Sequence, residues 1–236
     1  MTFEKLTQNI ATGLVHSKDY TDWAESLLSD GEQSENIAIL ASLGLDKHPD
    51  NYDVKFYFER SINDLGLFIK DTDELRIDCA ESLCNELLRN EISSATLINQ
   101  LDRFFTESDY EPIFSIWSEL SEDIWLLDDC GHSIFNSELT TDNKEEYIKK
   151  IAEQFIQLIH IDLPKSFFRQ SICKSCCHLG ETTSVRADKK WLSDKIYQLF
   201  YRQPAYYKSI CTQCQSSETL SMSDFNGRKL YLKNKY

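Results

Sequence analysis

The sequence is poor in glycine and proline, and it has no apolar segment of membrane-spanning length. Only 7 of its 236 residues are Gly and 4 are Pro. This scarcity argues against a loop-rich or all-β chain and favours long helices. No apolar run approaches the roughly 20 residues that cross a bilayer. The first residues, MTFEKLTQNIATGL, lack the basic start and apolar stretch of a signal peptide. We therefore expect a soluble, cytoplasmic protein with no membrane partner.

The common motifs of catalysis are missing as well. The sequence has no phosphate-binding Gly-rich loop, no HExxH and no GxSxG. Its five histidines are scattered, and the spacing around Cys130 and His132 gives no support to a catalytic Cys/His pair. We therefore predict that the chain is not an enzyme.

Helical periodicity is abundant. Between Asp19 and Ile161, seven segments place apolar residues at the spacing of one helix face, and short polar turns separate them. This pattern predicts an all-α domain over residues 1–161, arranged as an irregular HEAT-like helical array or a bundle. Cys79 and Cys84 lie among the apolar positions of one such segment, so we expect them to be core thiols.

Charge divides the chain near Leu163-Pro164. Residues 1–161 contain 33 Asp and Glu against 12 Lys and Arg, a net charge of −21, whereas residues 162–236 contain 6 against 13, a net charge of +7. The sequence therefore predicts two domains, an acidic helical one over 1–161 and a basic one over 162–236. The acidic portion should attract a basic partner and repel nucleic acid.

Two cysteine pairs give the strongest chemical signal. Cys173-Lys174-Ser175-Cys176 and Cys211-Thr212-Gln213-Cys214 each follow an isoleucine, with 34 residues between them. Two thiolates at this spacing bind one side of a tetrahedral metal ion, and the second pair completes a four-sulfur shell. A closed shell indicates a structural metal rather than a catalytic one. We predict a structural Zn²⁺ with four ligands: Cys173, Cys176, Cys211 and Cys214.

Two alternatives to this ligand set stay open. The cysteines can be ordinary reduced thiols, two of them in a core. Cys177 or His178 can also replace a neighbouring cysteine as a ligand, because both directly follow Cys176. Around the cysteines we expect a small zinc-ribbon-like module, with strands near Phe167–Ile172 and Tyr206–Ile210 and a helix between them that Asp188 caps. Its apolar content is low, so it should depend on metal binding or on contact with the helical domain.

Acidic residues cluster at two places in the helical domain. One cluster crowds the start of a helix near residue 72, and the other crowds a helix that ends at Cys130. The simplest explanation is a solvated face, with favourable carboxylates at a helix N-terminus. Carboxylates at the C-terminal end of a helix oppose its dipole, which favours a recognition surface instead. The predicted partner-binding residues are Asp71, Asp73, Glu74, Glu119, Glu122, Asp123, Asp128 and Asp129.

The basic C-terminal module suggests a second kind of partner. Zinc ribbons that carry basic and aromatic residues bind nucleic acid, so a nucleic-acid-binding or regulatory adaptor is the alternative function. The acidic remainder opposes the approach of a polyanion, and docking of the basic module on its acidic neighbour is the simpler expectation. The residues concerned are Lys189, Lys190, Trp191, Lys195, Tyr201, Arg202, Tyr206, Tyr207, Lys208, Arg228, Lys229, Lys233 and Lys235.

Three runs in the first half of the chain carry a family resemblance. They are Trp23-Ala24-Glu25-Ser26-Leu27-Leu28 followed by Gly31, Ser34-Glu35-Asn36-Ile37-Ala38-Ile39-Leu40-Ala41, and Phe58-Glu59-Arg60-Ser61-Ile62-Asn63-Asp64-Leu65-Gly66. Over about residues 15–130 this helical pattern resembles bacterial toxin-immunity proteins, of the contact-dependent growth inhibition or polymorphic toxin type. The resemblance implies a cytoplasmic inhibitor that binds a cognate toxin domain, often a basic nuclease, and blocks its active site. An acidic surface would speed capture of such a partner.

Overall fold

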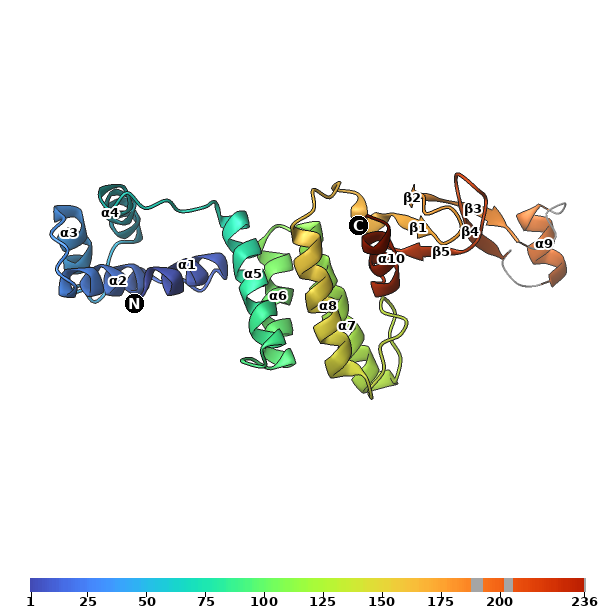
Figure 1. The fold of residues 1–236 in the computed structure, drawn as a ribbon, viewed down its shortest axis with the longest axis horizontal. Helices are drawn as coiled ribbons and strands as arrows, with labels where there is room; N and C mark the ends of the chain where they lie inside the picture. The colour runs from blue at the N-terminus through green and yellow to red at the C-terminus, as the bar shows by residue number, and fades with distance from the viewer. Residues whose placement is uncertain (188–192, 202–205, 236) are drawn as a thin grey trace.

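The computed structural model of the chain is elongated and largely helical, with small β-sheets near the C-terminus. It describes residues 1–187, 193–201 and 206–235. Four N-terminal helices, a central group of four helices and a C-terminal unit follow one another along the long axis (Figure 1). The fold is therefore not strictly all-α. No helix in the described part of the chain is long and apolar enough to cross a membrane.

The N-terminal unit is a cluster of four helices with its own apolar core. Trp23 lies at its centre, 1% exposed, between the rings of Phe3 and Phe58 at centroid distances of 5.7 and 5.4 Å. Side-chain caps at Ser34 and Asp50 fix two of the helix starts. The first helix has no counterpart among the seven predicted segments. The helices are α1 (Phe3–Ala11), α2 (Ser17–Ser29), α3 (Glu35–Leu43) and α4 (Asn51–Asp64).

The central unit is an antiparallel group of helices. α5 packs against both α6 and α8, and α6 also contacts α7 and α8. Aromatic rings of Phe104, Phe114, Trp117 and Phe155 meet in its core, and Cys79 and Cys84 are buried there, as expected for core thiols. The elements are α5 (Thr72–Leu88), α6 (Ser94–Glu107), the 3-10 helix η1 (Pro112–Phe114), α7 (Ser115–Cys130) and α8 (Lys144–Ile159).

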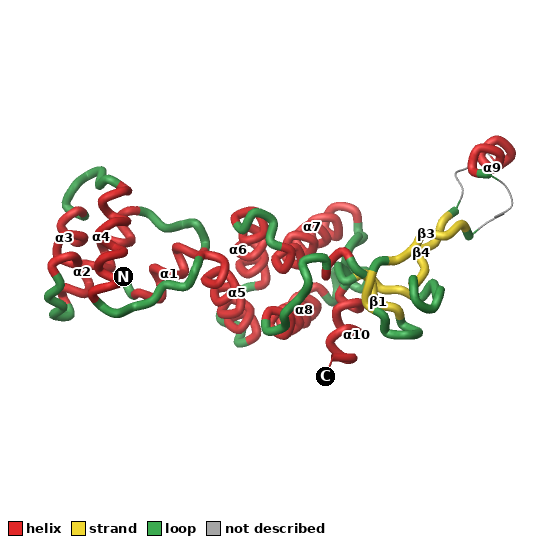
Figure 2. The backbone as a smooth tube through the Cα atoms, turned by 90° about the horizontal axis from the view of Figure 1, so that it is seen from above, coloured by secondary structure: helices red, strands yellow, loops and turns green. Residues whose placement is uncertain are grey.

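The C-terminal unit contains two small antiparallel sheets. One has the strand order β2-β1-β5, and the other is a two-stranded ribbon of β3 and β4 that leads to α9 at the far end of the molecule (Figures 1 and 2). The strand expected near Phe167–Ile172 is partly the 3-10 helix η2 (Phe167–Arg169). Asp188, the expected cap of the helix, lies outside the described residues. The other elements are β1 (Ser171–Cys173), β2 (Leu179–Gly180), β3 (Thr182–Arg186), α9 (Asp194–Tyr201), β4 (Tyr207–Cys211), β5 (Thr219–Ser221) and α10 (Phe225–Lys235).

The C-terminal helix α10 attaches this unit to the central helices. Five apolar residues of the C-terminal unit belong to the same buried core as α5–α8, and this core crosses the predicted boundary at residue 161: Phe167, Ile172, Met222, Phe225 and Leu232. The expected docking of the basic module on its acidic neighbour is thus present, but its main component is apolar burial. Gln154 of α8 completes the contact by donating to the carbonyl of Phe225 at 3.1 Å.

Arg228 is the polar centre of this contact and is 0% exposed. Its guanidinium donates to Gln154 Oε1 at 2.6 Å, to the Met222 carbonyl at 3.1 Å and to the Ser223 carbonyl. Burial lowers the pKa of Arg228 to about 10, although Glu119 opposes this shift. Arg228 was one of the basic residues considered for nucleic-acid contact, and it cannot serve there because α10 places it in the core.

Gly227 allows α10 to approach β5. A Cβ atom at this position would lie 2.0 Å from the backbone oxygen of Ser221, which no relaxation of a side chain can relieve. We predict that Gly227→Ala lowers the free energy of unfolding by about 2–4 kcal/mol, because α10 must shift out of its contact. Urea unfolding of the two proteins measures this difference.

Gly66→Ala is the control for a Cβ added where there is space. Gly66 has a left-handed backbone (φ +61), unlike Gly227, and nothing lies within 4 Å of its added Cβ. The Gly66→Ala substitution should lower the free energy of unfolding by only about 1–2 kcal/mol, through backbone strain. A Gly227→Ala variant no less stable than the control would contradict the close approach.

Candidate metal centre and acidic hollow

The four predicted metal ligands meet at the base of the β3–β4 ribbon. The sulfurs of Cys173, Cys176, Cys211 and Cys214 all lie within 4.8 Å of one another. Cys173 Sγ is 3.5 Å from Cys214 Sγ, and Cys176 Sγ is 3.7 Å from Cys211 Sγ. Sulfurs at the corners of a tetrahedron with metal–sulfur bonds of about 2.3 Å are roughly 3.8 Å apart. The cluster therefore has the size needed to hold one metal ion.

The two cysteine pairs lie in separate backbone turns of the same type. The N–H of Cys177 donates to the Cys173 carbonyl at 2.9 Å, and the N–H of Gln215 donates to the Cys211 carbonyl at 2.9 Å. Cys177 (φ 56) and Gln215 (φ 61) both adopt the left-handed conformation that ends the turn. Each turn directs its two sulfurs to the same point, so two local motifs far apart in sequence form one centre.

The turns favour the thiolate, which is the form that binds metal, at the first cysteine of each pair. Backbone amides of Cys214 and Gln213 donate to Cys211 and lower its pKa. At Cys173, burial raises the pKa, but hydrogen bonds from the backbone N–H groups of Cys176 and Ser175 outweigh it and lower the pKa to about 6. Backbone N–H groups of His178 and Ser216 also act to lower the pKa values of Cys176 and Cys214, but burial and the neighbouring sulfurs raise both. Four thiolates this close repel one another, and a bound cation removes that repulsion.

The alternative ligands lie outside this cluster. The group of described residues close enough to share a metal contains neither Cys177 nor His178. Cys130 is exposed at the end of α7, with its sulfur 3.2 Å from Asp129 Oδ2. Burial raises the pKa of Cys79 to about 11 and also raises that of Cys84, which fits inert core thiols.

Asp123, one of the predicted partner-binding residues, is buried. It is 0% exposed and accepts N–H bonds from the backbones of Ile134 (2.6 Å), Phe135 (3.0 Å) and Asn136 (2.7 Å). The side-chain amide of Asn136 adds a fourth bond at 2.9 Å. Its assignment to a partner-binding surface is therefore wrong, because this carboxylate holds the loop that follows α7.

Glu119 is also drawn inward, toward α10. Burial raises its pKa to about 7, while Arg228 and Ser223 favour the charged form and Asp123 and Glu122 oppose it. Its Oε2 is buried without a hydrogen-bond partner among the described residues. Glu119 thus belongs to the junction between α7 and α10 rather than to an open surface.

The other six predicted carboxylates are exposed, but they lie at two places. Glu122, Asp128 and Asp129 follow α7 toward its end, where Lys144 pairs with Asp128 at 3.2 Å. The second group lies at the start of α5. Successive central helices alternate in direction, so the end of α7 and the start of α5 are at opposite ends of the unit (Figure 1).

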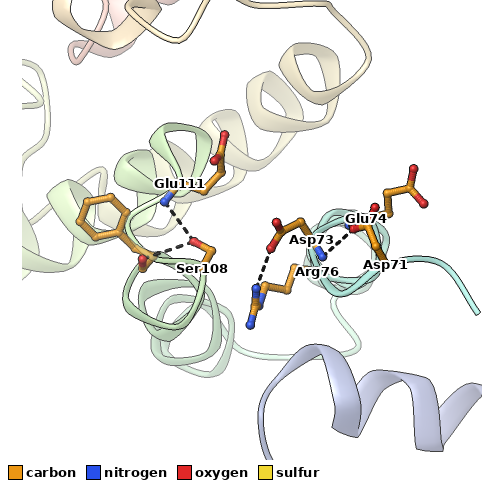
Figure 3. A network of polar contacts seen from close by, with 7 residues as sticks. Asp71, Asp73, Glu74, Arg76, Ser108 and Glu111 are labelled. Atoms are coloured by element: carbon orange, nitrogen blue, oxygen red, sulfur yellow. Dashed lines mark hydrogen bonds and ion pairs between the residues drawn. The ribbon is translucent and has the colours of Figure 1, made fainter.

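The α5 group borders a hollow of about 680 Å³. Ile77, Ile113 and Phe114 give it apolar walls, and the rim carries five carboxylates and one lysine: Asp71, Asp73, Glu74, Asp78, Glu111 and Lys70. Figure 3 shows Asp71, Asp73 and Glu74 at the start of α5 and Glu111 across from them. Glu111 was not predicted, because 30 or more residues separate it from the α5 group in sequence.

Several carboxylates of this rim already cap a helix or form ion pairs with neighbouring residues. Asp71 caps α5 by accepting from the N–H groups of Asp73 and Glu74, both at 2.9 Å. Asp73 pairs with Arg76 at 2.7 Å, and Lys70 pairs with Asp78 at 2.5 Å. Within the described ranges, no ion pair engages the carboxylates of Glu74 and Glu111. These two charges are therefore the ones most available to a partner.

Comparisons with known proteins give no match. No protein-family model, no curated protein and no solved structure matches the chain.

The raised pKa of Glu119 predicts a pH-dependent effect on stability. Between its ordinary value of 4.5 and about 7, the folded protein binds this proton more tightly than the unfolded chain does. This group therefore reduces stability as pH rises through that range, and the loss is complete above pH 7. Glu119→Gln removes the loss, so at pH 8 the variant should be more stable by about 1–2 kcal/mol.

Thermal unfolding of both proteins between pH 4 and pH 8 measures the effect. A Glu119→Gln difference that stays flat across the range contradicts the raised pKa.

Proposed function

We propose that the chain is an immunity-type inhibitor, a non-enzymatic cytoplasmic protein that binds a basic toxin domain. The observation that carries the proposal is the acid-rimmed hollow between α5 and η1. The family resemblance of residues 15–130 and the net charge of −21 over residues 1–161 support it independently.

The hollow suits the side chains of a basic protein. Lys and Arg have long apolar stems and a charged end, so stems can lie against Ile77, Ile113 and Phe114 while the charges meet the carboxylates of the rim. A nuclease uses such side chains to hold phosphates, and Glu74 and Glu111 offer them carboxylates instead of phosphate oxygens. Occupying these side chains blocks the substrate site without any chemistry in the inhibitor.

The acidic charge of the body also speeds association. Complementary charges steer two proteins together and raise the association rate above that of neutral surfaces, by an amount that decreases with salt. An inhibitor must reach its toxin before the toxin reaches nucleic acid. Fast, charge-steered capture is therefore a selective advantage for this class of protein.

We further propose that the metal is a structural Zn²⁺. Four thiolates in a tetrahedral arrangement suit zinc or iron, and zinc is the common ion of structural sites built from two cysteine pairs. Binding would stabilise the C-terminal unit by joining its two sheets. The shell is complete with four protein ligands, so the ion has no open position for substrate.

The inhibitor proposal predicts a charge-reversal phenotype. Co-expression with the product of the adjacent gene should yield a stable complex and protect cells from that product. Glu74→Lys with Glu111→Lys should weaken the complex by about 10- to 100-fold, because the carboxylates of the hollow become repulsive. Calorimetry of the purified pair measures the dissociation constant.

Asp128→Lys with Asp129→Lys is the matched control, since it changes the net charge equally at the other end of the central unit. Weakening by the control pair alone would place the interface at the end of α7 and refute the hollow. A protein that neither binds nor protects against its neighbour would refute the inhibitor function itself.

The zinc proposal predicts about one zinc per chain by elemental analysis. Cys173→Ser with Cys211→Ser should lose the ion and make residues 162–236 sensitive to proteolysis, because two sulfurs cannot hold it. Cys130→Ser and Cys177→Ser, both outside the cluster, should retain it. A metal-free full-length protein with an equally resistant C-terminal unit would contradict the prediction.

A further inference from the structure

The ribbon of β3 and β4 projects from the protein, and it carries α9 at its tip. Thr182 pairs with Cys211 beside the four sulfurs, and the ladder continues to the pair of Arg186 and Tyr207. These pairs are four residue steps apart, so the outer pair lies about 13 Å beyond the metal centre. In two perpendicular views α9 lies at the opposite end of the long axis from α1–α4 (Figures 1 and 2).

This projecting unit is basic, unlike the body. Its described residues, 182–187, 193–201 and 206–211, contain three Lys and Arg against one Asp, a net charge of +2. Lys195 on α9 and Lys208 on β4 are exposed. The guanidinium of Arg186 lies 4.7 Å from the ring centre of Tyr197, which links the ribbon to α9. Positive charge is thus present on both elements of the unit.

Exposed aromatic and apolar side chains lie among these cations. Tyr206 and Tyr207 are 66% and 45% exposed, and on α9 Leu199 and Ile196 are 77% and 45% exposed. Side chains alternate between the two faces of a strand. Tyr206 and Lys208 therefore share one face of the ribbon, and Tyr207 shares the other with Arg186, its direct partner. Each face presents one tyrosine beside one cation.

We propose that this projecting unit binds single-stranded nucleic acid. Base stacking on exposed rings, with cations placed for the backbone phosphates, is the usual way in which proteins hold unpaired strands. A duplex keeps its base faces stacked inside, so it can use the lysines but not the tyrosines. Lys195 and Lys208, both exposed, supply the phosphate contacts, and Tyr206 and Tyr207 supply the stacking surfaces.

The acidic body does not prevent this binding. At physiological ionic strength, charges separated by more than about 8 Å are largely screened. The outer part of the ribbon lies about 13 Å beyond the metal centre. The body is farther still, because β1 and β5 lie between the ribbon and α10 (Figure 1). The projection itself therefore separates a basic binding surface from the charge that would repel a polyanion.

The binding should show a defined dependence on salt. Each phosphate contact in a single strand contributes about 0.7 to the slope of log K against log salt. Two contacts give a slope of about −1.4, so affinity should decrease about sevenfold between about 50 and 200 mM KCl. Fluorescence anisotropy of the metal-loaded full-length protein with labelled oligo(dT) and oligo(U) of about 20 nucleotides measures this slope.

Two pairs of substitutions test the residues. Lys195→Glu with Lys208→Glu should weaken oligo(dT) binding at least about tenfold and reduce the slope. Tyr206→Ala with Tyr207→Ala should weaken oligo(dT) binding about tenfold while leaving the slope unchanged, because stacking involves no counterions. Lys47→Glu with Lys55→Glu, exposed lysines of the N-terminal unit with the same charge change, should have no effect.

Several outcomes would overturn the proposal. They are no anisotropy change at about 50 mM KCl, equal losses in the Lys47/Lys55 control, and full binding by the tyrosine variant. Tighter binding of duplex DNA would place recognition on phosphates alone, and tighter binding of polyglutamate would identify an acidic protein as the partner. None of these results bears on the hollow of α5, so the inhibitor proposal stands or fails separately.

Discussion

The convergence of four sulfurs is the constraint on which the C-terminal half of the structure depends. Cys173 ends β1, whose neighbour β5 leads directly to α10, and Cys211 ends β4, which forms half of the projecting ribbon. The four-sulfur cluster is therefore the point where the docked part and the projecting part of the unit meet. A two-stranded ribbon is marginally stable by itself in water. Its direction relative to the body follows from the geometry of this one centre.

Apolar burial, rather than charge, holds this unit to the central helices. The opposite net charges of the two parts suggest an electrostatic contact, but most of the acidic body takes no part in it. At the seam, Arg228 is fully buried, and its guanidinium bonds to Gln154 and two backbone carbonyls. A buried cation adds little net stability because of its desolvation cost. Its value here is geometric, since the bond to Gln154 holds α10 against α8 at this point.

The sequence was informative wherever a local pattern determines the outcome. The two Cys-x-x-Cys turns could be predicted because each depends on a few consecutive residues, and the helices of the central unit could be predicted from their apolar spacing. The failures involve partners distant in sequence. Asp123 looked like a surface carboxylate because the backbone N–H groups of residues 134–136 that bury it carry no sequence signature. Arg228 looked like part of a basic tail because its polar partner, Gln154, lies 74 positions away. Glu111 lies at the acidic hollow because η1 packs beside α5, and no pattern in the sequence indicates that contact.

Charge is separated along the long axis of the molecule, and the fold maintains that separation. A flexible basic tail would fold back on an acidic body, because the attraction between them increases as they approach. In this chain the ribbon ladder and the four-sulfur centre determine the direction of the basic unit and keep its outer part more than a Debye length from the body. The exposed carboxylates of the hollow and the lysines of the tip therefore remain unneutralised by each other. Surfaces of opposite sign can then serve two different partners from one small protein, which an unstructured tail of the same composition could not do.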